Sequence, residues 1–207
     1  MKKNFTHGID VILIILTLLL PCSFRDSGNN LKAQETGSFT DQRDGKIYKT
    51  VKIGNQWLMA ENFAFKPDHG KYWAYGNDAG NVAIYGYLYD WETAKNIAPN
   101  GWHLPSKEEW KNFRKALGSR MDIGFTMSKV YDQMVSGGSS GFNALFGGAY
   151  IIANNEFRGI GKVAYFWSSS ETSDGPTNYF VDGESGTAFL TNYADSRGGK
   201  SVRLFKD

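Results

Sequence analysis

Three groups of residues in this 207-residue chain have types and spacings that could do chemistry. Residues 137–141 read Gly-Gly-Ser-Ser-Gly and match the Gly-x-Ser-x-Gly pattern of serine hydrolases, in which a strained strand-to-helix turn exposes the nucleophile. The residues before and after this run do not read as a buried strand and a helix. We therefore expect Ser139 to lie in a flexible glycine–serine loop.

His103 is the second candidate, because imidazole is the side chain most often used as a general base. A general base needs a reacting partner and a tuned pKa, and no neighbour in the sequence supplies either. His103 stands between Trp102 and Leu104 just before a helix, which favours a buried, hydrogen-bonding role. Glu171, which follows Trp167 and three serines, is expected to tie a loop to the backbone.

The third candidate is a calcium site on the acidic loops of the C-terminal third. Carboxylates on such loops are common calcium ligands, and here they are Asp174, Asp182, Glu184 and Asp195. The chain has no Asp-x-Asp-x-Asp-Gly run and none of the Glu-Pro-Asn, Gln-Pro-Asp or Trp-Asn-Asp signatures of calcium-dependent lectins. Zinc and nucleotide sites lack a ligand spacing or a phosphate loop. We expect no metal and no cofactor.

Aromatic side chains, 15% of the residues, are the positive indication of a binding surface. Trp and Tyr rings can stack on sugars and act as anchors in protein interfaces. Trp73 and Tyr75 come just before residues 76–81, a Gly- and Asn-rich stretch, and loops on a rigid scaffold often carry binding residues. Trp73 and Tyr75 are therefore our candidate ligand-binding residues. The alternative is that both rings are buried, because a domain without disulfides needs them for stability.

The first 21 residues have the pattern of a signal peptide. Lys2 and Lys3 precede a ten-residue apolar stretch, which is shorter than the roughly 20 residues of a membrane-spanning helix. Two cleavage sites remain open. Residues 19–22, Leu-Leu-Pro-Cys, resemble a lipobox with Cys22 as the acylated residue, although a small residue normally stands at the position of Pro21. The second is an ordinary cut after Ala33.

Cys22 is the only cysteine, which favours the lipoprotein over the ordinary cut and leaves the exported domain without a disulfide. We expect residues 22–38 to form a flexible tether and the domain to begin at Phe39. The protein would then be anchored by lipid in the bacterial cell envelope, at the outer membrane. A formal charge of only +2 leaves no electrostatic signature of nucleic-acid binding.

A short helix after Ser106 is the clearest local structure. Ser106 is a good N-cap, and Glu109 completes a capping box that satisfies two orphan backbone donors. Trp110, Phe113 and Leu117 follow on one helix face. The pattern predicts a helix of about three turns that packs Trp110 into a core.

The remaining elements are mostly β. A hairpin is expected over residues 47–59 with Gly54-Asn55 as its turn. A first helix is expected over residues 88–98, and residues 118–141 are expected to be loop-rich. Short apolar runs then predict strands at 149–152, 164–167, 179–181, 188–190 and 201–204. These strands would form one small, twisted, mostly antiparallel sheet.

Several segments resemble the Fibrobacter succinogenes major paralogous domain. They are residues 51–62, 85–94, 101–110, 141–145, 166–171 and 201–207, in the order of the family from Phe39 to Asp207. The resemblance implies an α+β, C-type-lectin-like fold with two short helices packed on the small sheet and long loops. Related formylglycine-generating enzymes use a reactive cysteine pair, which this chain lacks. We assign structural roles to Trp102, His103, Ser106, Glu109, Trp110, Trp167 and Glu171.

The resemblance implies bacterial envelope proteins, often lipid-anchored, and it implies no particular activity. We expect a non-catalytic binding or adhesion module for glycans or protein partners. The alternative is an envelope enzyme on the same fold with an active site of unfamiliar design. The sequence favours the binding module, because it has no nucleophile–base pair, carboxylate pair or metal signature.

Overall fold

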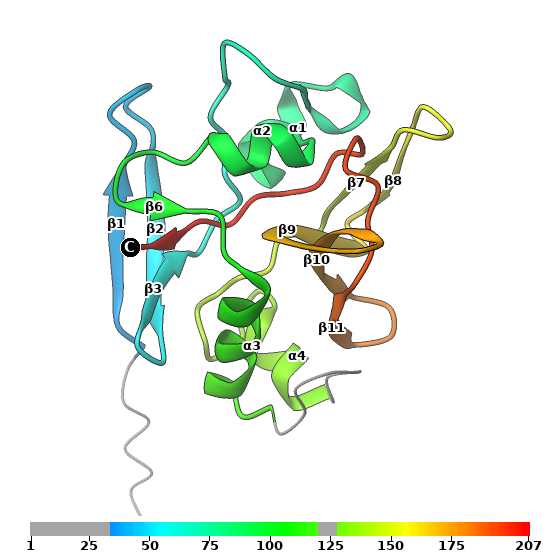
Figure 1. Cartoon of the computed structure of the whole chain (residues 1–207). Coiled ribbons are helices and arrows are strands. Elements are labelled where there is room, and N and C mark those ends of the chain that lie inside the picture. Colours follow the sequence, from blue (N-terminus) through cyan, green and yellow to red (C-terminus); the bar gives the residue numbers. More distant parts are fainter. Residues whose placement is uncertain (1–33, 120–127) are drawn as a thin grey trace, which may run out of the picture. The chain divides into compact units, whose positions relative to one another are not determined.

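The computed structural model describes residues 34–119 and 128–207, and the fold below refers to these residues. The predicted signal peptide, Cys22 and the tether up to residue 33 lie outside them. Within the described part, no helix has the length and apolar character needed to cross a membrane. The architecture is α+β, with two five-stranded sheets, a two-stranded ribbon and short helices (Figure 1).

The first sheet is antiparallel and has the order β1-β2-β3-β12-β6. Its strands are β1 (Thr36–Thr40), β2 (Ile47–Ile53), β3 (Gln56–Met59), β12 (Phe205–Lys206) and β6 (Trp102–His103). The β2–β3 hairpin is the one that the sequence predicts. Gly54 takes a φ of 62° in its turn, a conformation that glycine adopts without steric cost.

The second sheet has the order β11-β10-β9-β7-β8, with β7 parallel to β9 and the other pairs antiparallel. Its strands are β7 (Gly147–Ile151), β8 (Glu156–Ile160), β9 (Val163–Thr172), β10 (Gly175–Asp182) and β11 (Thr187–Thr191). The ribbon pairs β4 (Tyr72–Trp73) with β5 (Leu88–Tyr89). Four of the five strands predicted after residue 142 lie together in this second sheet, whereas the predicted hairpin lies in the first, so the fold has two sheets instead of the one that the sequence predicts.

The helices are α1 (Gly80–Tyr85), α2 (Trp91–Asn96), α3 (Lys107–Ala116) and α4 (Ser128–Met134), with a 3₁₀ turn η1 (Tyr75–Asn77). The helix predicted over residues 88–98 is shorter, because Leu88 and Tyr89 pair with β4 and Asp90 then caps α2 by accepting from the Thr93 N–H. Helix α4 lies in a stretch predicted to be loop, and β1 begins three residues before the expected domain boundary at Phe39.

Residues 199–204 connect the two sheets (Figure 1, red). The Ser201 carbonyl accepts from the Trp167 N–H of β9, at 3.0 Å. The Leu204 carbonyl accepts from the Met59 N–H of β3, also at 3.0 Å. The sequence predicts a strand here, but each neighbour contributes only one or two hydrogen bonds. The segment is an extended crossing between sheets.

Helix α3 has the predicted start and the predicted buried face. The Ser106 hydroxyl accepts from the Glu109 N–H at 3.2 Å, and a Glu109 oxygen accepts from the Ser106 N–H at 2.8 Å, so the capping box is present. Gly118, with φ of 86°, ends the helix by donating to the Lys115 carbonyl. Trp110 is fully buried, and its indole stacks on Tyr179 with ring centroids 4.9 Å apart.

Two variants test this helix. We expect Ser106→Ala to lower the free energy of unfolding by about 0.5–2 kcal/mol through loss of the cap. Trp110→Ala should cost about 3–5 kcal/mol through loss of a buried ring. Denaturant unfolding measures both. Ser139→Ala, in an exposed turn, is the control and should change little. A Trp110→Ala variant as stable as the control would contradict the core assignment.

Candidate functional site

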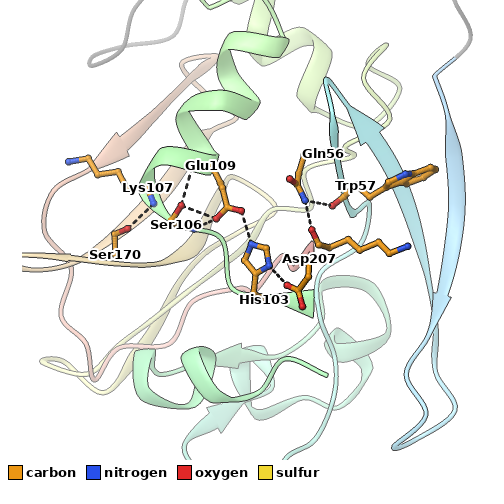
Figure 2. Close-up of polar contacts among 9 residues, drawn as sticks. Gln56, Trp57, His103, Ser106, Lys107, Glu109, Ser170 and Asp207 are labelled. Atoms are coloured by element: carbon orange, nitrogen blue, oxygen red, sulfur yellow. Dashed lines mark hydrogen bonds and ion pairs between the residues drawn. The ribbon is translucent and has the colours of Figure 1, made fainter. Parts of the chain in front are cut away.

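A chain of polar contacts joins β6, the start of α3 and Asp207 (Figure 2). The two ring nitrogens of His103 lie 2.6 Å from Asp207 Oδ1 and 2.7 Å from Glu109 Oε1. The second oxygen of Glu109 accepts from the Ser106 hydroxyl at 2.8 Å. Ionised carboxylates can only accept hydrogen bonds, so this geometry favours the imidazolium form of His103, in which both ring nitrogens carry protons.

Strand pairing and the helix cap position these groups. Phe205 of β12 lies opposite His103, so Asp207 comes alongside Gly101 and donates its N–H to that carbonyl at 3.1 Å. The capping box fixes the Glu109 carboxylate on the other side of the ring. The cluster therefore links α3, through Glu109, to His103 and Asp207, which are 104 positions apart in the sequence.

The electrostatics of the cluster favour its charged form. Partial burial alone would lower the pKa of His103, but the hydrogen bonds to Asp207 and Glu109 outweigh it and raise this pKa above its ordinary 6.5. Partial burial would likewise raise the pKa of Glu109, but hydrogen bonds from Ser106 and His103 lower it below its ordinary 4.5. The cluster is an ion-paired clamp, which we call the His103 clamp.

The His103 clamp is poorly suited to acid–base catalysis. Both ring nitrogens are occupied, and the Ser106 hydroxyl bonds to Glu109 instead of to His103, so the chain of contacts holds no nucleophile–base pair. The predicted hydrogen-bonding role of His103 fits this geometry. The predicted burial is wrong, because 36% of the side chain remains exposed at the edge of the sheet.

A hollow of about 320 Å³ adjoins the His103 clamp, between the β2–β3 turn and α3. We call it the amide pocket, because three of its lining side chains are amides. Its lining consists of Ile53, Gly54, Asn55, Gln56, Glu109, Asn112, Phe113 and Ala116. Ile53 and Phe113 are buried and belong to the core, so the pocket combines an apolar base with a polar rim.

The amides of this pocket differ in how they are used. Gln56 donates to the carbonyls of Lys206 and Trp57, at 2.6 and 3.3 Å, and is held in place by β12 (Figure 2). Asn55 and Asn112 are exposed, and neither side chain hydrogen-bonds to any residue that the structure describes. An amide both donates and accepts, so these two side chains can bind a ligand rich in hydroxyl or amide groups.

A larger hollow, of about 390 Å³, lies beside α2 and includes His69, Lys71, Asp90 and Thr93 in its lining. Two of its polar groups are already used locally. Asp90 caps the helix, and the Thr93 hydroxyl accepts from the Lys71 N–H at 2.8 Å. The side chains of His69 and Lys71 bond to no residue that the structure describes.

Trp73 and Tyr75, two positions apart in the sequence, both contact the second sheet and are partly buried. The Trp73 ring stacks on Tyr150 with centroids 4.5 Å apart, and the Tyr75 ring packs on Phe157 at 5.2 Å. The Tyr75 hydroxyl also accepts from the Ile160 N–H at 3.4 Å. Each ring thus has a packing role, and neither forms a fully exposed platform.

The other aromatic residues singled out by the sequence are buried. Trp102 is 8% exposed, and Trp167 is fully buried and donates its indole N–H to the Tyr89 carbonyl at 2.7 Å. The role predicted for Glu171 is wrong. Glu171 is exposed and bonds to no described side chain or backbone group, whereas Ser170 accepts from the Lys107 N–H at 2.9 Å and ties β9 to α3.

Two of the four acidic residues use their carboxylates within their own turns, and Glu184 pairs with Lys162 at 2.7 Å. Asp182 accepts from the Glu184 N–H and the Ser185 hydroxyl, each at 2.8 Å, and these contacts lower its pKa. Asp195 pairs with Arg197. Across residues 34–119 and 128–207, His, Cys, Asp and Glu do not gather in a group of three that could hold a metal ion.

Sequence reasoning missed the amide pocket and Asp207. Asn112 follows Glu109 by three positions on α3, so the helical period places both on one face, and this signal was present. For Asn55, the sequence indicates only a place in the hairpin turn. That Asp207 would reach His103 had no local signal, because their contact depends on the pairing of β12 with β6.

Comparison with known proteins identifies one family. The model of the Fibrobacter succinogenes major domain matches residues 51–206, which include the β2–β3 turn, His103, Glu109 and the second sheet. No curated protein and no solved structure matches the chain.

The His103 clamp predicts a pH-dependent stability. Because folding raises the pKa of His103, its contribution is fully present below about pH 6.5 and is lost as the pH rises through the higher folded value. The contribution of Glu109 is also stabilising but has the opposite pH dependence, and it is lost in acid, below about pH 4.5. We expect His103→Gln to lower the melting temperature by several degrees near pH 5.5 and by less near pH 8.5.

Thermal unfolding of both proteins across this pH range measures the difference. His69→Gln, at an exposed histidine, is the control and should show no such trend. A melting difference between wild type and His103→Gln that stays constant with pH would contradict the ion-paired clamp.

Proposed function

Since the chain belongs to the Fibrobacter succinogenes major domain family, we propose that it is a non-catalytic lipoprotein of the bacterial cell envelope that binds glycans or protein partners. In this proposal the described domain is a binding or adhesion module, and a lipid on Cys22 holds it at the outer membrane. We also propose that the fold is C-type-lectin-like. Its α+β architecture with antiparallel and mixed sheets supports that assignment.

The observation that carries the proposal is the amide pocket. Asn55 and Asn112 present hydrogen-bond donors and acceptors that the protein itself leaves unused, above the buried side chains of Ile53 and Phe113. Small-molecule sites commonly combine an apolar lining with a few convergent polar groups. Amides recognise a ligand by hydrogen bonding and are weak acids and bases, so this pocket suits binding better than chemistry.

The His103 clamp supports the non-catalytic part of the proposal. A histidine that acts as a base must have one nitrogen free to take a proton. Here both nitrogens lie within 2.7 Å of a carboxylate oxygen, and the hydrogen bonds to these carboxylates raise the pKa of His103. Its carboxylate Glu109 lines the amide pocket, so the clamp also fixes one wall of that pocket.

The envelope location rests on the N-terminal sequence. Residues 1–21 have the length and polarity of a signal peptide, and Cys22 follows directly. A single acyl chain binds membranes only weakly, whereas two or more give stable anchoring, so a diacylated Cys22 would hold the domain at a bilayer.

A binding assay tests the pocket. The full-length protein in detergent is applied to an oligosaccharide array and, by cross-linking, to the envelope proteins of its own cell. We expect retention of a glycan or a protein, and the double variant Asn55→Ala/Asn112→Ala should weaken it at least about tenfold. The control is Asn100→Ala, an exposed amide outside the pocket. Full retention by the double variant would contradict the assignment of this pocket.

A fractionation experiment tests the anchor. We expect Cys22→Ser to move the protein from the membrane fraction to the soluble fraction and to abolish labelling by radioactive palmitate. The protein lacks other cysteines, so the variant removes every thiol that could be acylated. Unchanged membrane partition together with a mature N-terminus at Gln34 would show that cleavage follows Ala33 instead.

A further inference from the structure

We propose that the outer face of the first sheet, around Trp57, binds an acidic oligosaccharide. The site is a groove of about 130 Å³ lined by Gly37, Ser38, Thr50, Trp57, Trp102 and Lys206, which we call the Trp57 groove. It is separate from the amide pocket, whose lining shares none of these residues. The inference rests on the proposed function as a binding module and adds a second site with a defined ligand class.

The first observation concerns the indole N–H groups. Three tryptophans donate theirs to backbone carbonyls: Trp91 to Ser168 at 2.8 Å, Trp110 to Trp167 at 3.3 Å and Trp167 to Tyr89 at 2.7 Å. Trp57, Trp73 and Trp102 donate to no residue that the structure describes. A tryptophan that serves only the core normally finds a partner for this group. Of these three, Trp57 and Trp102 line the same groove.

The second observation is the register of the sheet. Lys52 lies opposite Trp57 across β2 and β3, and Lys206 lies opposite Trp102 across β12 and β6. Since Phe205 pairs with Leu58, Lys206 also comes next to Trp57. Residues directly opposite each other share a face of the sheet. One row on this face therefore reads Lys52, Trp57, Lys206, Trp102.

The third observation is the space beside the Trp57 ring. Gly37 of β1 lies next to it, and a Cβ at Gly37 would stand 3.4 Å from the ring and 3.1 Å from the Thr50 hydroxyl. A larger residue there would fill the groove. Thr50 is only 5% exposed, and its hydroxyl bonds to no described residue at the base of the groove. The face of the Trp57 indole matches the apolar face of a sugar ring, and a sugar stacked there would direct a hydroxyl towards Thr50.

The charges select an acidic sugar. Lys206 is exposed and has no ion pair with any described residue, and Lys52 pairs with Glu35 at 3.2 Å through an exposed contact that contributes little stability. A carboxylate on a sugar stacked on Trp57 would meet both ammonium groups. Nucleic acid fits less well, because its binding relies on many phosphate contacts, whereas this row holds two lysines.

Isothermal titration calorimetry of the full-length protein in detergent tests the site, with short oligogalacturonates as the acidic ligand and malto-oligosaccharides as the neutral comparison. We expect the oligogalacturonates to bind more tightly, with an affinity that falls as NaCl is raised. Trp57→Ala and Lys206→Gln should each weaken binding at least about tenfold. Lys206→Gln changes an exposed side chain, so it keeps the test valid if Trp57→Ala disturbs folding.

Two control variants separate this proposal from the proposed function. Trp73→Ala removes another indole with no hydrogen-bond partner among the described residues, and Asn112→Ala alters the amide pocket; neither should change oligogalacturonate binding. If the protein does not bind oligogalacturonates but its binding on the array depends on Asn112, the Trp57 groove is not an acidic-sugar site and the proposed function still holds. Binding that Trp57→Ala and Lys206→Gln leave unchanged would also overturn the assignment of this groove. Binding to anionic lipid vesicles that depends on Trp57, without binding to oligogalacturonates, would also contradict the proposal, because the ligand of the groove would then be a membrane surface.

Discussion

The buried guanidinium of Arg203 is the interaction on which the rest of this structure depends. It is fully buried and donates four hydrogen bonds to neutral oxygens, those of Asn62, Met59, Phe142 and Asn143, at 2.7–3.1 Å. Burial lowers its pKa to about 9. A buried charge is costly unless its donors are satisfied, and moving any one acceptor would leave a buried N–H of the guanidinium without a hydrogen bond. Arg203 therefore fixes its own segment relative to β3 and to the loop before β7.

The two surface features discussed above follow from that arrangement. With Arg203 fixed, β12 pairs with β3 and β6, which brings Lys206 to the outer face beside Trp57 and Asp207 to His103. The Lys206 carbonyl also holds Gln56 at the edge of the amide pocket. The same two-residue strand thus contributes to the His103 clamp, the amide pocket and the Trp57 groove, which makes the proposed binding surfaces parts of one rigid frame.

Local structure, such as helix caps and turns, could be predicted from the sequence, whereas the long-range pairing of strands could not. The capping box of Ser106 and Glu109 and the Gly54 turn depend on residues within a few positions, so their patterns sufficed. The division into two sheets and the pairing of Leu88 with β4 depend on distant partners. Arg203 lies between Val202 and Leu204. In a strand, successive side chains point to opposite faces, so this pattern predicts that Val202 and Leu204 face the core and Arg203 faces the solvent. Its burial follows from carbonyls about 60 and 140 residues away.

Native-state hydrogen exchange of an Arg203→Lys variant tests the central claim most directly. Lysine keeps the charge but lacks the planar fork that reaches several carbonyls at once. The account predicts the largest loss of protection at the Met59, Phe63 and Trp167 amides, which donate to residues 201–204. Amides between β1 and β2 should change least. Equal loss across the domain, or unchanged protection at those three amides, would contradict the claim that Arg203 holds the crossing segment between the sheets.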